Sequence, residues 1–453
     1  YAWSFTPEGS VTPEPAFATQ ANPTTLHNYS AALQGTLTLE VTDADGGKTT
    51  VHYALTPNQF PDDASEMGLI NTLVAGSAHT CALLNDGNVR CWGLNDYGQL
   101  GYGHKNNIGD NERPYTAGNL QLGDGVVQLA AGSEHTCALL RSGYVRCWGR
   151  NQYGQLGYGH VQSVGDDEAL LSQSYVNLGA RAVRLAAGDS HTCALLTTGK
   201  VRCWGYNNYG QLGYAHTQNV GDDEGLWDVS DVQVGGSVQD LVAGASHTCA
   251  LLTGGRVRCW GYNGYGQLGY GNATVIGDTE HPSSAGDVNV GGTVLQLSTS
   301  YHQTCALLDT GSVRCWGYNG YGQLGYGHAT NLSSPGADIA LGARALQVTA
   351  GGYHTCALLS SGQVKCWGYN GHGELGYSHT TVSYAPSSAP LNLGGATAYA
   401  LTAGFYHTCA LLSSGQALCW GYNANGRLGY GHTASIGDDE LPFTSGEVAL
   451  LDP

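Results

Sequence analysis

Fourteen cysteines recur at a regular spacing along this chain of 453 residues. They form seven pairs whose partners are ten positions apart: Cys81 and Cys91, Cys137 and Cys147, Cys193 and Cys203, Cys249 and Cys259, Cys305 and Cys315, Cys356 and Cys366, and Cys409 and Cys419. The first cysteine of each pair advances by 56, 56, 56, 56, 51 and 53 residues. A period of about 50 residues is typical of a repeat architecture such as a solenoid or a propeller.

Each cysteine pair lies in a predicted β-hairpin. The segment H-T-C-A-L-L is followed by a polar triplet ending in glycine, such as 85–87, and then by V-R-C-W-G. A three-residue hairpin loop favours glycine at its left-handed position. In this register Cys81 faces Cys91, and opposed side chains lie about 5 Å apart, within reach of a disulfide. We therefore predict one disulfide per hairpin and an oxidising compartment. Zinc sites are disfavoured because the spacing lacks the tight C-x-x-C knuckle.

Two further apolar segments flank each hairpin, as at 183–188 before one hairpin and 287–290 after the next. Each repeat then reads as four strands, and seven such units match a closed β-propeller. We predict an all-β chain whose residues 68–453 form a seven-bladed propeller of four-stranded blades. Closure of the ring is expected to rest on packing of the first blade against the last.

The composition excludes several functional classes. Lys and Arg number 17 against 35 Asp and Glu, which gives a net charge of −18, so binding to nucleic acid is disfavoured. The hydrophobic share of 42% can build a core, which argues against overall disorder. No apolar run approaches the roughly 18 residues of a membrane span.

The run W-G-Y-N-x-x-G-Q-L-G-Y-G at 260–271 and 316–327, together with H-T-C-A-L-L, resembles the repeat of the regulator-of-chromosome-condensation family of seven-bladed propellers. The similarity covers residues 70–451. The paired cysteines resemble the secreted bacterial branch of that family. The resemblance implies a propeller that presents one face to a protein partner. Guanine-nucleotide exchange is not expected, because the even repeats leave no room for a large inserted wedge.

The first 56 residues lie outside the repeat. Residues 1–5 and 35–55 read as alternating strands, the latter a hairpin around 45–47. They resemble part of an immunoglobulin-like or PKD-like β-sandwich, so we predict a partial sandwich over 1–56 and a linker over 57–67. The chain starts at Tyr1 with no signal peptide, so we expect a processed or truncated product, or a sandwich completed by a strand from another chain.

The long connections after the third strands are expected to share one face of the propeller. They carry tyrosines at matching positions, which suit recognition: Tyr97, Tyr153, Tyr209, Tyr265 and Tyr321, replaced by His372 and Asn425 in the last two blades. A second tyrosine series, Tyr102 to Tyr430, is expected to pack beneath the loops. Trp227 and the segment 298–303 break the repeat, and Trp227 is a candidate partner anchor or a packing residue.

The same loops contain acidic clusters, among them Asp166, Asp167, Glu168, Asp222, Asp223 and Glu224. They are weak candidates for Ca²⁺, and capping of loop amides is the favoured role. Histidines such as His79 recur two residues before the first cysteine of a pair, where a corner hydrogen bond to the backbone is expected. Six near-identical copies do not define one catalytic site, and no catalytic or phosphate-binding motif is present. We predict no cofactor, no favoured metal and no enzymatic activity.

These observations together predict a secreted or surface-displayed bacterial protein that binds a protein or glycan partner through its tyrosine-rich loop face. The alternative is a structural subunit of an extracellular fibre or surface layer. Such a subunit would bind copies of itself by strand complementation of the incomplete N-terminal sandwich.

Overall fold

The computed structural model describes residues 2–7, 17–18, 35–42, 48–55 and 70–451. The chain divides into two compact units, Tyr1–Met67 and Gly68–Pro453. The linker predicted over 57–67 lies outside the described residues.

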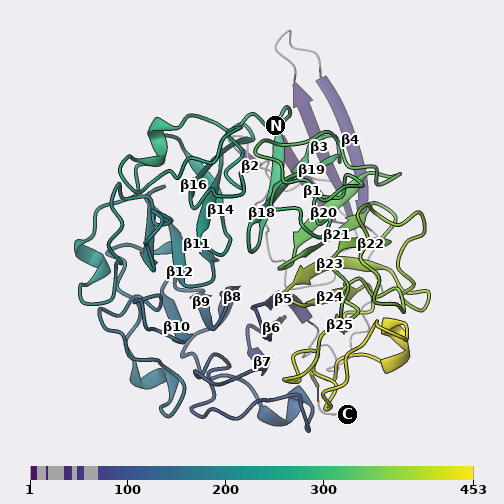
Figure 1. The fold of residues 1–453 in the computed structure, drawn as a ribbon, viewed down its shortest axis with the longest axis horizontal. Coiled ribbons are helices and arrows are strands. Elements are labelled where there is room, and N and C mark those ends of the chain that lie inside the picture. Colours follow the sequence, from purple (N-terminus) through teal and green to yellow (C-terminus); the bar gives the residue numbers. More distant parts are fainter. Residues whose placement is uncertain (1, 8–16, 19–34, 43–47, 56–69, 452–453) are drawn as a thin grey trace. The chain divides into compact units, whose positions relative to one another are not determined.

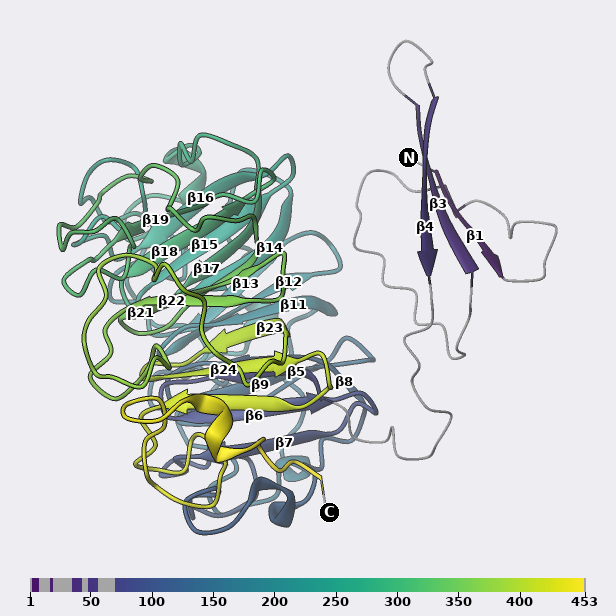
Figure 2. The same ribbon diagram turned by 90° about the vertical axis from the view of Figure 1, so that its right-hand side faces the viewer.

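The first unit contains one antiparallel sheet in the order β2-β1-β3-β4. Its strands are β1 (Ala2–Pro7), β2 (Phe17–Ala18), β3 (Gly35–Thr42) and β4 (Lys48–Leu55), three of which are labelled in Figure 2. Strands β3 and β4 pair from Gly35 with Leu55 to Thr42 with Lys48, which confirms the predicted hairpin. A sandwich requires two sheets, so the partial immunoglobulin-like or PKD-like sandwich stays a prediction.

The second unit consists of seven three-stranded antiparallel sheets. Figure 1 shows them following one another around a central axis, so that β23 and β24 of the last blade lie beside β5 of the first. The blades are, in order, β5 (Ile70–Ala75), β6 (His79–Leu84) and β7 (Val89–Gly93); β8 (Val126–Ala131), β9 (His135–Leu140) and β10 (Val145–Gly149); β11 (Ala182–Ala187), β12 (His191–Leu196) and β13 (Val201–Gly205); β14 (Val238–Ala243), β15 (His247–Leu252) and β16 (Arg256–Gly261); β17 (Val294–Thr299), β18 (Gln303–Leu308) and β19 (Val313–Gly317); β20 (Ala345–Ala350), β21 (His354–Leu359) and β22 (Val364–Gly368); β23 (Ala398–Ala403), β24 (His407–Leu412) and β25 (Ala417–Gly421). The predicted seven-bladed architecture is confirmed.

The predicted fourth strand of each blade is reduced to a single point of pairing. Val176 forms one isolated bridge with Val145, and Val232 forms one with Val201. The chain turns immediately afterwards: the amide of Val234 bonds back to the carbonyl of Val232 at 3.0 Å, and Gly235 follows at φ 81°. So short a segment has no room for a ladder of hydrogen bonds, and the prediction of four-stranded blades is corrected to three strands plus this bridged segment.

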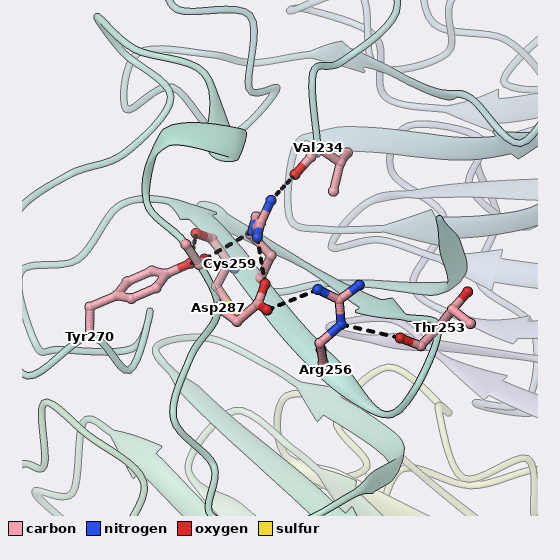
Figure 3. A network of polar contacts seen from close by, with 8 residues as sticks. Val234, Thr253, Arg256, Cys259, Tyr270 and Asp287 are labelled. Carbon is pink, nitrogen blue, oxygen red and sulfur yellow. Dashed lines mark hydrogen bonds and ion pairs between the residues drawn. The ribbon is translucent and has the colours of Figure 1, made fainter. Parts of the chain in front are cut away.

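Arginine side chains hold the short segments that replace the predicted fourth strands. Figure 3 shows these contacts for the segment that contains Asp287. In the fourth blade Arg258 forms an ion pair with Asp287 and donates to the carbonyl of Gly286 at 2.9 Å. It also donates to the carbonyl of Val234 in the preceding blade at 2.6 Å. Arg256 contacts the same Asp287 carboxylate at 3.2 Å. The arginine side chain thus replaces the missing ladder and also joins neighbouring blades.

All seven predicted hairpin disulfides are present. Each joins residues that face each other directly in the register of the second and third strands, with Cα atoms 4.0–4.1 Å apart. Every cysteine is fully buried. The tyrosines of the second series pack where predicted: the hydroxyl of Tyr214, for example, accepts a hydrogen bond from the amide of Cys203 at 3.0 Å. That contact satisfies an amide at the outer edge of the sheet, where no fourth strand runs.

The corner histidines link six of the seven blades to the next, and Gln303 takes this position in blade five. Nε2 of His135 lies 2.9 Å from the hydroxyl of Thr192 in the following blade, and that hydroxyl donates to the carbonyl of Gln155 at 2.9 Å. Because the threonine hydroxyl already donates its proton to this carbonyl, it must accept a hydrogen bond from the histidine Nε2. The indole of Trp204 donates to the same carbonyl at 2.9 Å. The predicted hydrogen bond from histidine to the backbone is wrong, because the side chain crosses to the neighbouring blade instead.

The helices of the described residues are single 3-10 turns in the long loops: η2 (Pro114–Ala117), η3 (Leu170–Ser172), η4 (Leu226–Asp228), η5 (Pro282–Ser284) and η6 (Pro442–Ser445). None of them has the length or apolar character needed to cross a membrane.

Candidate functional site

The loop that follows each third strand is held rigidly by a buried asparagine. In the third blade Oδ1 of Asn207 accepts the amide of Leu212 at 2.9 Å, while its Nδ2 donates to the carbonyls of His216 and Gln218, each at 2.8 Å. The amide of Tyr209 donates to the side chain of Gln211 at 3.0 Å. The loop tyrosines are thus presented by an ordered backbone, which lowers the entropic cost of binding.

Rings of neighbouring blades contact each other in sequence across this face. Each loop tyrosine of the predicted series packs against the residue that follows Trp-Gly in the next blade. The ring centroids are 4.7 Å apart for Tyr153 and Tyr206, 4.9 Å for Tyr209 and Tyr262, 5.0 Å for Tyr265 and Tyr318, 5.0 Å for Tyr321 and Tyr369, and 4.3 Å for His372 and Tyr422. We call these ten residues the aromatic belt. Their tilted and edge-on arrangements are the favourable ones for aromatic pairs.

The pairing of aromatic rings does not extend to the loop of the first blade. Tyr97 packs against Arg150 rather than an aromatic ring, with the guanidinium carbon 4.7 Å from the ring centroid. At the junction of the last and first blades the corresponding residues are Asn425 and Leu94, which carry no aromatic ring. The aromatic belt is therefore an open arc over six blades. Tyr209 and Tyr265 are its most exposed predicted members, at 41% and 36%.

A second group of rings lies nearer the channel, at the corners between the first and second strands. Tyr301, His302, Tyr353, Phe405 and Tyr406, which we call the corner cluster, come from blades five, six and seven. Tyr353 joins them to the belt, with its ring centroid 5.1 Å from that of Tyr321. Burial lowers the pKa of His302 to about 4, so this imidazole is neutral in the cluster.

The sequence analysis did not identify the corner cluster, apart from the break at 298–303. Its signal is the pair of residues that precedes H-T-C. That pair is Ser-Ala, Ser-Glu, Asp-Ser and Ala-Ser in the first four blades, but Tyr-His, Gly-Tyr and Phe-Tyr in the last three. Comparison of these two positions across the seven repeats would have located the corner cluster.

Trp227 lies apart from both groups. Its side chain, on η4, is 57% exposed, and it takes part in none of the ring pairs within the described residues. Leu171 on η3 and Phe443 on η6 occupy the same position in their loops and are 51% and 37% exposed. Trp227 is thus not a filler of an interior gap, and its role as a partner anchor stays a prediction.

The acidic loop clusters bring their carboxylates together. The side chains of 166–168 have oxygens within 4.8 Å of one another, and those of 222–224 and 438–440 do the same. Glu168 accepts the amide of Gly165 at 3.0 Å, and Asp166 pairs with Lys105 at 2.9 Å. Burial and the adjacent acidic side chains raise the pKa of Glu440 to about 7. Capping of loop amides agrees with these contacts, and Ca²⁺ binding stays the weaker prediction.

Seven copies of one motif arranged in a closed ring define a seven-bladed repeat propeller, with aromatic side chains over one loop face. The family model described as the RCC1-like domain matches residues 34–335 and 165–445. The chain belongs to this family, which confirms the resemblance seen in its repeats.

Named relatives and solved structures agree with this assignment. The ultraviolet-B receptor UVR8 of Arabidopsis thaliana is 30% identical over 363 residues, covering 79% of this chain and 78% of the receptor. The mouse E3 ubiquitin-protein ligase HERC2 is 30% identical over 82% of this chain, which corresponds to only 7% of the ligase. The structure of human WBSCR16 superposes with a TM-score of 0.66 at 23% identity, covering 78% of this chain and 93% of that one. Prp20p of Saccharomyces cerevisiae superposes with a TM-score of 0.60 at 21% identity, over 78% and 83%. These two structures show the fold alone.

Proposed function

We propose that this chain is a non-catalytic interaction module that binds a protein partner through the aromatic belt and the corner cluster. The observation that carries this proposal is the continuous run of half-buried rings, held on ordered loops, across one face of the propeller. Aromatic side chains are enriched in the centres of protein interfaces, where they add large contact area at low entropic cost.

The relatives support a protein rather than a small-molecule partner. The yeast structure with the same fold is described by its binding to Gsp1p and histones. The related proteins are named as an ultraviolet-B receptor and an E3 ubiquitin-protein ligase. Aromatic rings also stack on sugars, so a glycan is the other outcome that the binding experiment must distinguish.

The test compares partner capture by the wild-type chain and by a Tyr209→Ala/Tyr265→Ala double variant, using the surface and secreted proteins of the source organism. Tyr144→Ala is the matched control, because Tyr144 is 40% exposed beside a hairpin turn. We expect the double variant to lose the partner and the control to retain it. Capture that is unchanged in the double variant would contradict the proposal. Capture that is abolished by enzymatic removal of glycans would identify a glycan ligand instead.

The proposed location is outside the cytosol, on the surface of a bacterium or in its surroundings. Seven buried disulfides support an oxidising compartment, because cytosolic thiols are kept reduced. The bacterial origin rests on the cysteine pairs shared with the secreted branch of the family. Fractionation of the source cells, followed by alkylation of free thiols, tests both points. A cytosolic protein with free thiols would overturn this location.

A structural role in a fibre or surface layer is the second candidate. The N-terminal sheet has the order β2-β1-β3-β4, so β2 and β4 are edges within the described strands. Unpaired strand edges accept a strand from another chain. Electron microscopy of the purified chain over a range of concentrations tests this role. Concentration-dependent filaments would favour it over the interaction module, and a monomer at all concentrations would exclude it.

A further inference from the structure

The central channel opens on the loop face through a ring of corner residues. Each corner contributes one of them: Ser77, Ser133, Asp189, Ala245, Tyr301, Gly352 and Phe405. Hydrogen bonds between neighbouring corners hold the ring, for example from the amide of Ser133 to the carbonyl of Asp189 at 3.3 Å. A cavity of about 90 Å³ lies here, lined by five of these corner residues, Ser77, Ser133, Asp189, Ala245 and Phe405, and by the small residues before the corners. The channel mouth is thus a fixed recess and not a gap between mobile loops.

Asp189 is the only acidic residue among the seven corner residues. Its carboxylate is half-buried and makes no ion pair or side-chain hydrogen bond within the part of the chain that the structure describes. Nearby Glu134 is already paired with Arg150. Burial, with a further contribution from Glu134, raises the pKa of Asp189 to about 6. An unpaired, partly desolvated carboxylate is costly for the free protein, and a cation would relieve that cost.

An aromatic ring, that of Phe405, also lines this cavity. Tyr301 of blade five and Phe405 of blade seven meet with ring centroids 5.2 Å apart, although they are separated by a whole blade. The intervening corner is Gly352, where an added Cβ would lie 2.8 Å from Cγ of Phe405. The glycine therefore makes room for the Phe405 ring at the channel. Burial raises the pKa of Tyr301, and the negative charge of Asp189 adds to this shift.

We propose that the channel mouth binds the ammonium head of a lysine side chain presented by the partner, with Asp189 as the counter-ion and the ring of Phe405, packed against Tyr301, as the aromatic wall. Ammonium groups are attracted to aromatic faces, most strongly in desolvated sites. The cavity is several times larger than the space that one water needs, which suits an ammonium and its first methylene groups. This inference rests on the proposed interaction function and specifies the chemistry that the partner must supply.

The test titrates the full chain with Nα-acetyl-lysine-N-methylamide and with the same compound acetylated at Nε, monitored by NMR line broadening of the probe. We expect millimolar binding of the charged probe and at least tenfold weaker binding of the neutral one. Asp189→Asn should weaken binding of the charged probe at least tenfold, and Phe405→Leu several-fold. Asp86→Asn, in an exposed hairpin turn, is the matched control and should bind as the wild type does.

Equal binding of both probes, or full binding by Asp189→Asn, would overturn the proposal. Loss of an unpaired carboxylate should leave the melting temperature of Asp189→Asn unchanged or raised, so misfolding is checked in the same samples. The outcomes distinguish a failure of the belt proposal from a failure of the cation-site proposal. If the belt variant keeps its partner while the lysine probe still binds, the belt proposal fails and the cation site remains. If the probe does not bind while the belt variant loses its partner, only the cation site is withdrawn.

Discussion

Nε2 of His407 lies 2.8 Å from the hydroxyl of Thr80, a residue 327 positions earlier in the chain. The hydroxyl of Thr80 and the indole of Trp92 both donate to the carbonyl of Arg427, at 3.0 and 2.9 Å. The same set of contacts joins the interior blades. The ring is therefore closed by the hydrogen bonds that join each blade to the next, and not by packing alone.

Thr80→Val should weaken this closure. The substitution keeps the shape of the side chain but leaves the buried Nε2 donor of His407 without an acceptor, which costs about 1–3 kcal/mol. Thr192→Val, at an interior junction with the same geometry, is the matched control. We expect both variants to lose similar free energy of unfolding in denaturant titrations. A Thr80→Val variant as stable as wild type would show that the terminal junction does not need this bond.

Acidification should destabilise the propeller. Burial lowers the pKa of His79 to about 3 and that of His135 to about 4, and four further corner histidines are shifted in the same direction. The unfolded chain takes up these protons below a pH of about 6.5, whereas the folded chain does not, so stability is lost as the pH falls through that value. Each histidine contributes up to about 1.4 kcal/mol per pH unit in this range.

Denaturant midpoints measured between neutral pH and about pH 4.5 test this dependence on the histidines. His191→Gln is the control variant, because Gln303 occupies the equivalent position in blade five and donates to Thr355 at 3.2 Å. We expect a shallower fall in stability for this variant. A flat profile for the wild type would contradict the prediction.

Glu374→Gln should stabilise the protein at alkaline pH. Glu374 replaces the glutamine of the first five loops, and its Oε1 is buried without a hydrogen-bond partner. Burial raises its pKa to about 7, so the carboxyl favours the fold when protonated, and that stability is lost as the pH rises from about 4.5 through 7. The gain from Glu374→Gln should be near zero at acidic pH and on the order of 2–3 kcal/mol above pH 8. A gain independent of pH would point to a cause other than ionisation.

The disulfides should resist reduction in the folded protein. The cysteines are fully buried, so a reducing agent reaches them only when a blade opens. Mass spectrometry after treatment with dithiothreitol and alkylation should find no modified cysteine under native conditions and fourteen in denaturant. Removal of one bridge in a Cys193→Ala/Cys203→Ala variant should cost about 2–3 kcal/mol, since the closed loop is short. Rapid native reduction would contradict this picture.

The sequence predicted the features that repeat and missed those that depend on neighbouring blades. Hairpin register follows from Cys81 and Cys91 and their glycine turn, and it is confirmed. The fourth strand was predicted from alternating residues alone, whereas the turn at Gly235 leaves it one bridge long. The partner of His135 is a threonine of the next blade, so no pattern within one repeat could reveal it.

In the candidate site, too, the features that repeat were predicted and those that depend on contacts between blades were missed. The loop tyrosines were predicted from their matching positions, and the structure places them in contact with the following blade. Phe405 and Tyr301 come from blades that are not adjacent, and their contact depends on the missing side chain of Gly352. Only the folded ring brings such residues together.

The open arc of the aromatic belt removes the rotational equivalence of seven similar blades. Asn425 and Leu94 mark one junction, and Asp189 and Phe405 line the channel mouth from two different blades. A ligand that meets both features can dock at only one angle about the propeller axis. Under the proposed binding mode, the propeller would therefore select the orientation of its partner as well as its chemistry.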